Sequence, residues 1–163
     1  MTSSLGAAVW TALARVMDPE IPAVSITEMG MVLDVMAGDG DAEVTLLPTF
    51  TGCPAIDVIV ADVEQAVGAL EGVDSVRVRL AYDPPWSTER ITEEGRAKLK
   101  QSGLAPPAQG AVLITDIRLP AAAQCPYCGG SDTTADNAFG PTPCRAIYYC
   151  RSCRNPFEQF KPV

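Results

Sequence analysis

Four cysteines in the last third of the chain form two short pairs that could hold a metal ion. The pairs are Cys125-Pro126-Tyr127-Cys128 and Cys150-Arg151-Ser152-Cys153, and 21 residues separate them. Each Cys-x-x-Cys turn directs two sulfurs toward one point, and an intervening hairpin brings the turns together, so four thiolates can surround a zinc ion tetrahedrally. We therefore predict a zinc ribbon over residues 124–163, with Cys125, Cys128, Cys150 and Cys153 as ligands of a structural zinc.

Three other uses of this cysteine pattern are two redox sites, a cluster site and disulfides. No helical context accompanies either pair, and no export signal precedes them, so these uses have less support than zinc. A segment of about 40 residues cannot bury enough apolar surface to fold alone. The metal is therefore expected to hold the ribbon together.

Cys53 is a candidate reactive or metal-transferring thiol, because it lies where an apolar segment runs into a helical pattern that begins near Ala55. The first N–H groups of a helix lack intrahelical partners, and their partial positive charge favours a thiolate. Gly52 allows a tight bend, Pro54 suits the first helical turn, and Thr49 offers a nearby hydroxyl. The alternative is a small buried hydrophobic residue that happens to precede a helix.

Two further groups could act with this thiol. The segment Asp18-Pro19-Glu20-Ile21-Pro22 places two carboxylates on a loop that its prolines restrict. It is either a solvated helix exit or a carboxylate pair that faces Cys53 across a cleft. Cys144, the remaining cysteine, could replace a zinc ligand, pack as a buried thiol, or act with Cys53. Its spacing from the other cysteines does not favour any one of these roles.

The composition narrows the classes of function. The chain has no histidine, so chemistry that needs an imidazole base is excluded within it, and a thiol enzyme that uses Cys53 as nucleophile has little support. The net charge is −8, with −9 in residues 1–120 and +1 in residues 121–163, which argues against a nucleic-acid partner. No signal-peptide pattern and no long apolar run occur, so we expect a cytoplasmic protein with no membrane partner.

The order of periodic segments predicts an α+β fold. Helical or strand-like patterns occur in the order α-β-β-α-β-α, over residues 5–17, 30–36, 42–48, 55–70, 73–80 and 92–102. This order is typical of a two-layer α/β sandwich, with helices on one face of a three- or four-stranded mixed sheet. We expect an α/β domain over residues 1–107, a linker over residues 108–123 that can add an edge strand at 112–119, and the ribbon.

Two motifs resemble the small α/β domain of SufT-like iron–sulfur cluster assembly factors: Asp18-Pro19-Glu20-Ile21-Pro22 and Thr49-Phe50-Thr51-Gly52-Cys53-Pro54-Ala55. With further features, the chain resembles the PaaD family, accessory subunits encoded with the multicomponent phenylacetyl-CoA epoxidase of aerobic phenylacetate breakdown. Those features are Tyr82-Asp83-Pro84-Pro85-Trp86, Ile91-Thr92, Leu99, Gly103-Leu104-Ala105-Pro106-Pro107, Phe139-Gly140 and Cys144-Arg145-Ala146. The resemblance covers nearly the whole chain.

The resemblance implies a non-catalytic role in maturing or repairing the oxygenase's metal centres, either the reductase's iron–sulfur cluster or the di-iron site. The implied partners are the oxygenase and reductase subunits and the iron–sulfur assembly machinery. The implied functional residues are Asp18, Glu20, Thr49, Cys53 and Cys144. One soft ligand and one or two hard ligands suit transient capture of iron or an iron–sulfur cluster rather than a permanent site.

Related assembly domains often read Thr-x-Pro-x-Cys-Pro, whereas Thr51-Gly52 occupies the middle here, so only Thr49, Cys53 and Pro54 carry over. The alternative role is a structural docking subunit of the oxygenase complex that transfers no metal and binds through the ribbon and the surface around Trp86. The sequence does not fix the oligomeric state, for which a homodimer is one option.

Overall fold

The computed structural model describes residues 4–107 and 123–161 and divides into two compact units, Met1–Trp86 and Ser87–Val163. Each unit has its own sheet and its own buried core. The expected mixture of helices with a mixed sheet is confirmed. In the sequence, the two units meet after Trp86, whereas the predicted α/β domain extends to residue 107.

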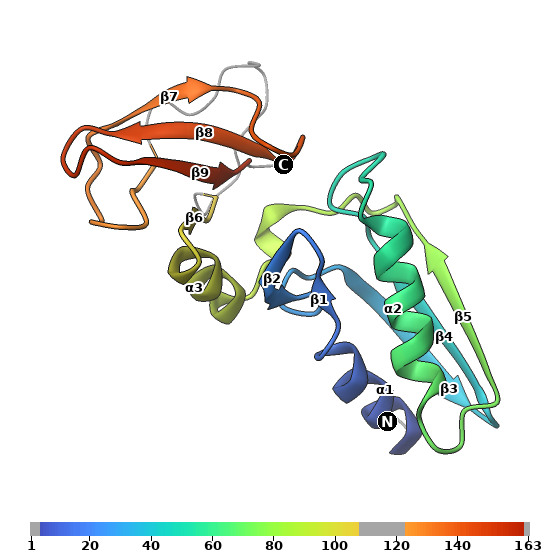
Figure 1. Ribbon diagram of the computed structural model, residues 1–163. Coiled ribbons are helices and arrows are strands. Elements are labelled where there is room, and N and C mark those ends of the chain that lie inside the picture. The colour runs from blue at the N-terminus through green and yellow to red at the C-terminus, as the bar shows by residue number, and fades with distance from the viewer. Residues whose placement is uncertain (1–3, 108–122, 162–163) are drawn as a thin grey trace. The chain divides into compact units, whose positions relative to one another are not determined.

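The first unit is built on a three-stranded mixed sheet of β3 (Val32–Gly38), β4 (Asp41–Leu46) and β5 (Ser75–Leu80), in that spatial order. β3 and β4 form an antiparallel hairpin, whereas β4 and β5 run parallel. A parallel pair requires a crossover connection, which helix α2 (Ile56–Gly68) supplies. Helices α1 (Ser4–Leu13) and α2 contact each other and cover one face of this sheet (Figure 1).

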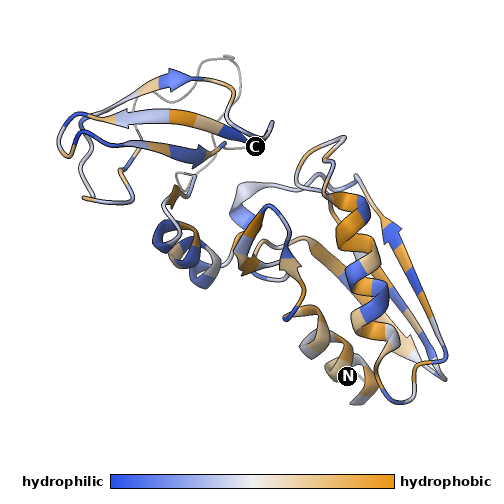
Figure 2. Ribbon diagram, in the orientation of Figure 1, coloured by the Kyte–Doolittle hydropathy of each residue, from blue (hydrophilic) through white to orange (hydrophobic). Residues whose placement is uncertain are grey.

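The core of the first unit lies between the two helices and the sheet. On β4, Ala42, Val44 and Leu46 are buried while the residues between them are not, as expected for a strand with one covered face. The helices contribute apolar side chains at helical spacing: Val9, Leu13, Ile59, Val63 and Val67. These residues confirm the predicted helical faces, and both helices are largely hydrophobic in Figure 2.

The segment after α1 departs from the sequence-based expectation. The first helix ends at Leu13 rather than near residue 17, and a small hairpin of β1 (Met17–Asp18) and β2 (Ile21–Ser25) follows it. The Asp18 carboxylate accepts hydrogen bonds from the backbone N–H groups of Glu20, at 2.8 Å, and Ile21, at 3.0 Å. The proline-rich segment is therefore a tight turn that its own aspartate stabilises.

Trp86 closes the first unit. Its side chain is 6% exposed, and its indole N–H donates a 2.8 Å hydrogen bond to the backbone carbonyl of Met29. The indole ring itself therefore offers no face to a partner, and docking through the exposed residues before it stays a prediction.

The second unit has a four-stranded sheet in the order β6-β9-β8-β7. Its elements are η1 (Thr88–Arg90), α3 (Glu93–Gln101), β6 (Leu104–Ala105), β7 (Thr133–Asn137), β8 (Arg145–Cys150) and β9 (Pro156–Phe160). A side chain caps the start of α3, since the Thr92 hydroxyl accepts a 3.0 Å hydrogen bond from the N–H of Gly95. α3 is largely hydrophilic (Figure 2), as its sequence of charged residues requires.

The segment at residues 104–107, which is predicted from the sequence as the end of the α/β domain, begins with a strand. β6 pairs in parallel with β9, Leu104 with Glu158 and Ala105 with Gln159, and Ala105 is buried in the core of the ribbon. Residues 87–107 therefore fall in the same compact unit as the ribbon, whereas the sequence groups them with the α/β domain. The linker with its edge strand at 112–119 lies outside the described residues, and the domain limits stay a prediction.

Replacing Trp86 with phenylalanine tests the closing contact of the first unit. Trp86→Phe keeps an aromatic ring but removes the pyrrole half of the indole with its N–H donor, which leaves the Met29 carbonyl without that partner in a buried place. We expect the free energy of unfolding to fall by about 1–3 kcal/mol in urea denaturation followed by circular dichroism. Trp10→Phe is the matched control, because Trp10 is 38% exposed, and a change within about 0.5 kcal/mol is expected there. Equal losses in the two variants would contradict the role of the hydrogen bond.

Candidate functional site

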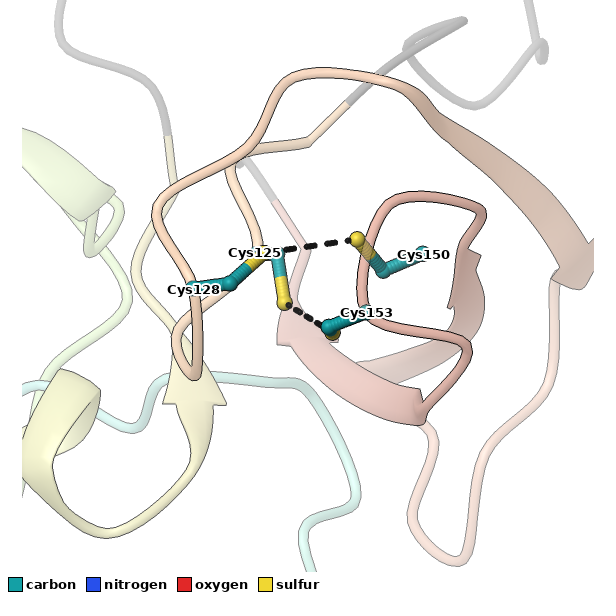
Figure 3. Close-up of side chains that lie close together, drawn as sticks. All are labelled: Cys125, Cys128, Cys150 and Cys153. Atoms are coloured by element: carbon teal, nitrogen blue, oxygen red, sulfur yellow. Dashed lines mark hydrogen bonds between the residues drawn. The ribbon is translucent and has the colours of Figure 1, made fainter.

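The four predicted zinc ligands lie together in the second unit (Figure 3). The sulfurs of Cys125, Cys128, Cys150 and Cys153 all lie within 4.8 Å of one another, with 3.6 Å between Cys125 and Cys153 and 3.6 Å between Cys128 and Cys150. A tetrahedral zinc ion with Zn–S bonds of about 2.3 Å holds its sulfurs about 3.8 Å apart. The cluster therefore has the donor set and the dimensions of a structural zinc site.

Two backbone knuckles with the same hydrogen-bond pattern position these sulfurs. The N–H of Cys125 donates to the carbonyl of Gly130 at 3.0 Å, and the N–H of Cys150 donates to the carbonyl of Asn155 at 3.0 Å. The fourth residue after the leading cysteine has a positive φ in both, 74° at Gly129 and 60° at Arg154. The second knuckle thus holds an arginine in a conformation that favours glycine. Residue types could not have shown that the Asn155 carbonyl accepts this hydrogen bond, because every residue carries a backbone carbonyl.

The protonation of the cluster shows how its thiols interact. Burial alone would raise the pKa of the Cys153 thiol, but hydrogen bonds from the backbone and side chain of Asn155, and from neighbouring thiols, lower it to about 7. The N–H of Gly130 lowers the pKa of Cys128, whereas the Cys150 thiol, burial and the other two thiols raise it to about 12. Cys153 therefore loses its proton more readily than Cys128, and a metal ion that binds the four sulfurs would displace the protons that remain.

The cluster is part of the ribbon's core. Cys125 and Cys150 are fully buried, and they pack in one apolar group with β6, β8 and β9. The rings of Tyr148 and Phe157 stack in that group with centroids 5.7 Å apart. Because the ligands and the apolar side chains occupy the same interior, metal binding and packing depend on each other.

Cys144 lies outside the group of four. It is a buried residue before β8, its thiol is 3.1 Å from the Thr142 hydroxyl, and its carbonyl accepts a 2.8 Å hydrogen bond from the N–H of Lys161. Within residues 4–107 and 123–161, the metal-ligand cluster is complete without it. This placement fits a packed thiol, and a functional role for Cys144 stays a prediction.

Cys53 lies on a turn that leads into α2, as the sequence predicts. The residue is half-buried, its N–H donates to the carbonyl of Phe50 at 3.2 Å, and Gly52 has a φ of 81°. The helix begins at Ile56, and its N-cap residue, Ala55, gives no side-chain hydrogen bond to the helix start. A partly accessible thiol therefore stands next to a helix end whose cap side chain cannot satisfy the first N–H groups.

Asp18 lies beside a different part of α2. Asp18 and its neighbouring prolines line a groove against the stretch from Asp62 to Ala69 in the second half of that helix. Ile56 and Ala66 are about 15 Å apart along the helix axis, since each residue rises about 1.5 Å. The groove thus contains Asp18 without Cys53. Thr49 is on the loop that carries Cys53, whereas Glu20 is on the β1–β2 turn with Asp18.

Comparison with known protein families divides the chain into two matched segments. The profile described as "Iron-sulfur cluster assembly protein" matches residues 6–80, and the profile described as "PaaD zinc beta ribbon domain" matches residues 111–161. The chain is 37% identical over 155 residues to a putative 1,2-phenylacetyl-CoA epoxidase subunit of Escherichia coli K12, covering 95% of this chain and 92% of that protein.

Shorter relatives match the first part of the chain. An Fe-S protein maturation auxiliary factor of Porphyromonas gingivalis is 38% identical over 88 residues, which is 53% of this chain and 83% of that protein. The crystal structure of a DUF59 domain from Bacillus anthracis superposes with a TM-score of 0.53 at 33% identity, covering 56% of this chain and 87% of that one.

In the described part of the chain, every helix is too short or too polar to cross a membrane.

Serine substitutions test the metal centre. We expect the purified protein to hold close to one zinc ion per chain, and Cys125→Ser or Cys150→Ser to release it, because each removes a buried ligand. Elemental analysis measures the zinc, and hydrogen exchange should show lost protection in the ribbon while the first unit stays protected. Cys144→Ser is the control that should keep its zinc. Zinc retention in the ligand variants, or exchange throughout the chain, would contradict this interpretation.

The reactivity of Cys53 can be measured separately. We expect the pKa of its thiol to lie below that of an ordinary free cysteine, because the N-terminal end of α2 favours the thiolate. The rate of alkylation at Cys53 against pH, followed by mass spectrometry of the zinc-loaded protein, gives this pKa. An ordinary or higher pKa, or no reaction in the folded state, would make Cys53 a packing residue.

Proposed function

Because this chain belongs to the PaaD family of phenylacetyl-CoA epoxidase subunits, we propose that it is a non-catalytic accessory protein of that epoxidase. In this role it assists the assembly or repair of a metal centre, either an iron–sulfur cluster or the di-iron site. The oxygenase and reductase subunits are its clients, and the iron–sulfur assembly machinery is the source of its metal.

The observation that carries this proposal is how the matches divide between the two segments. The part with Cys53 resembles maturation factors that consist of little else, since the aligned segment covers 83% of the Porphyromonas gingivalis factor. The ribbon is present in the full-length epoxidase relative and in the family profile for residues 111–161. We assign the metal-handling step to the α/β domain and client selection to the ribbon.

The chemistry of the thiol site suits a carrier. Cys53 supplies one soft ligand that is partly accessible, and Asp18 is engaged by its own turn and lies in the groove against the second half of α2. A single thiolate with weak neighbours holds iron or a cluster only until the client offers a fuller ligand set. The zinc site is separate in role, because two of its four ligands are fully buried in the ribbon core.

The second candidate function is a structural docking subunit that transfers no metal. Exposed aromatic side chains on the second unit favour it: Tyr127 is 59% exposed, Phe139 is 73% exposed and Tyr149 is 36% exposed. Aromatic residues of this kind are enriched at protein interfaces. Under this alternative, the chain co-purifies with the oxygenase in stoichiometric amount and the oxygenase carries its metal without Cys53.

Truncation of the thiol separates the two functions. We expect Cys53→Ala to change the free energy of unfolding by no more than about 0.5 kcal/mol, because the residue is on a partly exposed turn, yet to abolish maturation. The variant is expressed with the epoxidase subunits, and the metal content and phenylacetyl-CoA turnover of the purified oxygenase are measured.

Thr51→Ala, an exposed change on the same turn, is the matched control and should leave both quantities unchanged. Full metal and turnover with Cys53→Ala would favour the docking alternative. A loss of about 1 kcal/mol or more, with activity following stability, would make Cys53 a packing residue.

A further inference from the structure

Three large apolar side chains are exposed at the end of the first unit that carries Cys53. They are Phe50, which is 38% exposed, Leu80, which is 38% exposed, and Tyr82, which is 58% exposed. None of them is among the buried core residues, and none is a ligand of the zinc site. Clustered apolar exposure of this kind marks a surface that another molecule covers.

The parallel pairing of β4 and β5 brings these residues to one edge. Leu46 pairs with Leu80, and the N–H of Ala81 donates a 2.8 Å hydrogen bond to the carbonyl of Leu46, so the two strands end side by side. The loop after β4 carries Phe50 and Cys53, and Tyr82 follows directly after β5. Figure 1 shows the loop before α2 and the arrowhead of β5 at the same end of the unit.

An acidic side chain borders this apolar edge. Asp57 is the second residue of α2, which begins directly after the Cys53 turn, and it is exposed. It therefore lies at the same end of the unit as the end of β5 (Figure 1). Asp83 follows Tyr82 and is also exposed.

The charge of the whole first unit restricts what can bind here. Residues 1–86 carry a net charge of −10, and no lysine or arginine occurs between Arg15 and Arg77. Arg77 and Arg79 both pair with Glu43, at 3.8 Å and 3.3 Å. A second copy of this surface, a nucleic acid or an anionic membrane would be repelled, whereas a cationic protein surface would be attracted.

We infer that the edge formed by Phe50, Leu80 and Tyr82, bordered by Asp57 and Asp83, is the docking surface for a client protein that presents lysine or arginine side chains around an apolar spot. Docking at this edge brings a client that the ribbon has selected next to the Cys53 turn, and so positions the metal acceptor beside the thiol. The inference rests on the proposed function, since the client is taken to be an epoxidase subunit.

Two matched pairs of variants test this surface in the full-length, zinc-loaded protein. Tyr82→Asp is compared with Met36→Asp, because Met36 is 57% exposed and pairs across the sheet with Glu43, away from the helices. Asp57→Lys is compared with Glu71→Lys, an exposed position after the far end of α2 that changes the net charge equally. The probe is the purified metal-free oxygenase and reductase subunits, and the dissociation constant is measured at low and high salt.

We expect Tyr82→Asp to raise the dissociation constant about tenfold or more, while Met36→Asp stays within about twofold of the wild type. Asp57→Lys should lower the association rate and make that rate less dependent on salt concentration. Glu71→Lys should change both quantities by a smaller amount. Equal effects within either pair, or no binding of the wild type to any subunit, would overturn the inference. So would a melting temperature of Tyr82→Asp well below that of Met36→Asp, because the edge would then be covered by the protein itself.

Client metal content, measured in the same samples, separates this inference from the proposed function. If the wild type and Cys53→Ala both bind through the edge but neither changes the client's metal content, the docking surface is supported and the proposed maturation role is contradicted. If Tyr82→Asp matures the client as fast as the wild type, maturation stands and docking at this edge is overturned.

Discussion

The stability of the second unit depends on buried cysteine sulfurs, which must be negatively charged thiolates to bind a metal ion. Cys125 and Cys150 are fully buried, and they share their core with only a few apolar side chains from the ribbon's strands. Thiolates in such an interior are strongly unfavourable unless a cation neutralises them. A zinc ion meets both needs, because it neutralises the thiolates and links the two knuckles that the small core alone could not hold together.

In the first unit, topology places the reactive group. A parallel neighbour for β4 requires a crossover, and the helix that makes it must start near the carboxyl end of β4. Cys53 lies in that connection, so its position beside a helix start follows from strand order rather than from a dedicated scaffold. The same topology gathers the ends of β4 and β5 around it, and for this reason the thiol and the apolar edge share one end of the unit.

Most of the fold and the zinc site could be predicted from the sequence, since both depend on short-range patterns. The spacing of Cys125, Cys128, Cys150 and Cys153 predicts their cluster, and helical or alternating periodicity located α2, α3, β4 and β5 within a few residues. The prediction failed where long-range pairing decides the outcome. β6 has two residues, too few for a periodic signal, and it is a strand only because β9 lies beside it.

Two other failures have similar causes. The sequence around Asp18 is typical of a helix exit. No local pattern shows that its carboxylate accepts hydrogen bonds from two backbone N–H groups and so closes a hairpin. Trp86 reads as a surface residue after a proline-rich break, but its hydrogen bond is to Met29, which is distant in the sequence. The placement of Asp18 relative to Cys53 was likewise beyond the sequence, because it depends on which half of α2 the hairpin meets.

The pairing of β6 with β9 also sets an order on the folding of the ribbon. Residues 104 and 158 are far apart along the chain, so this pair can form only after β9 has been synthesised, and it must overcome the entropy of closing a long loop. Zinc capture by the two knuckles joins residues 125–128 to residues 150–153 and shortens the loop that remains to be closed. We therefore expect β6 to pair with β9 sooner in a chain whose two knuckles have bound zinc than in one without the metal.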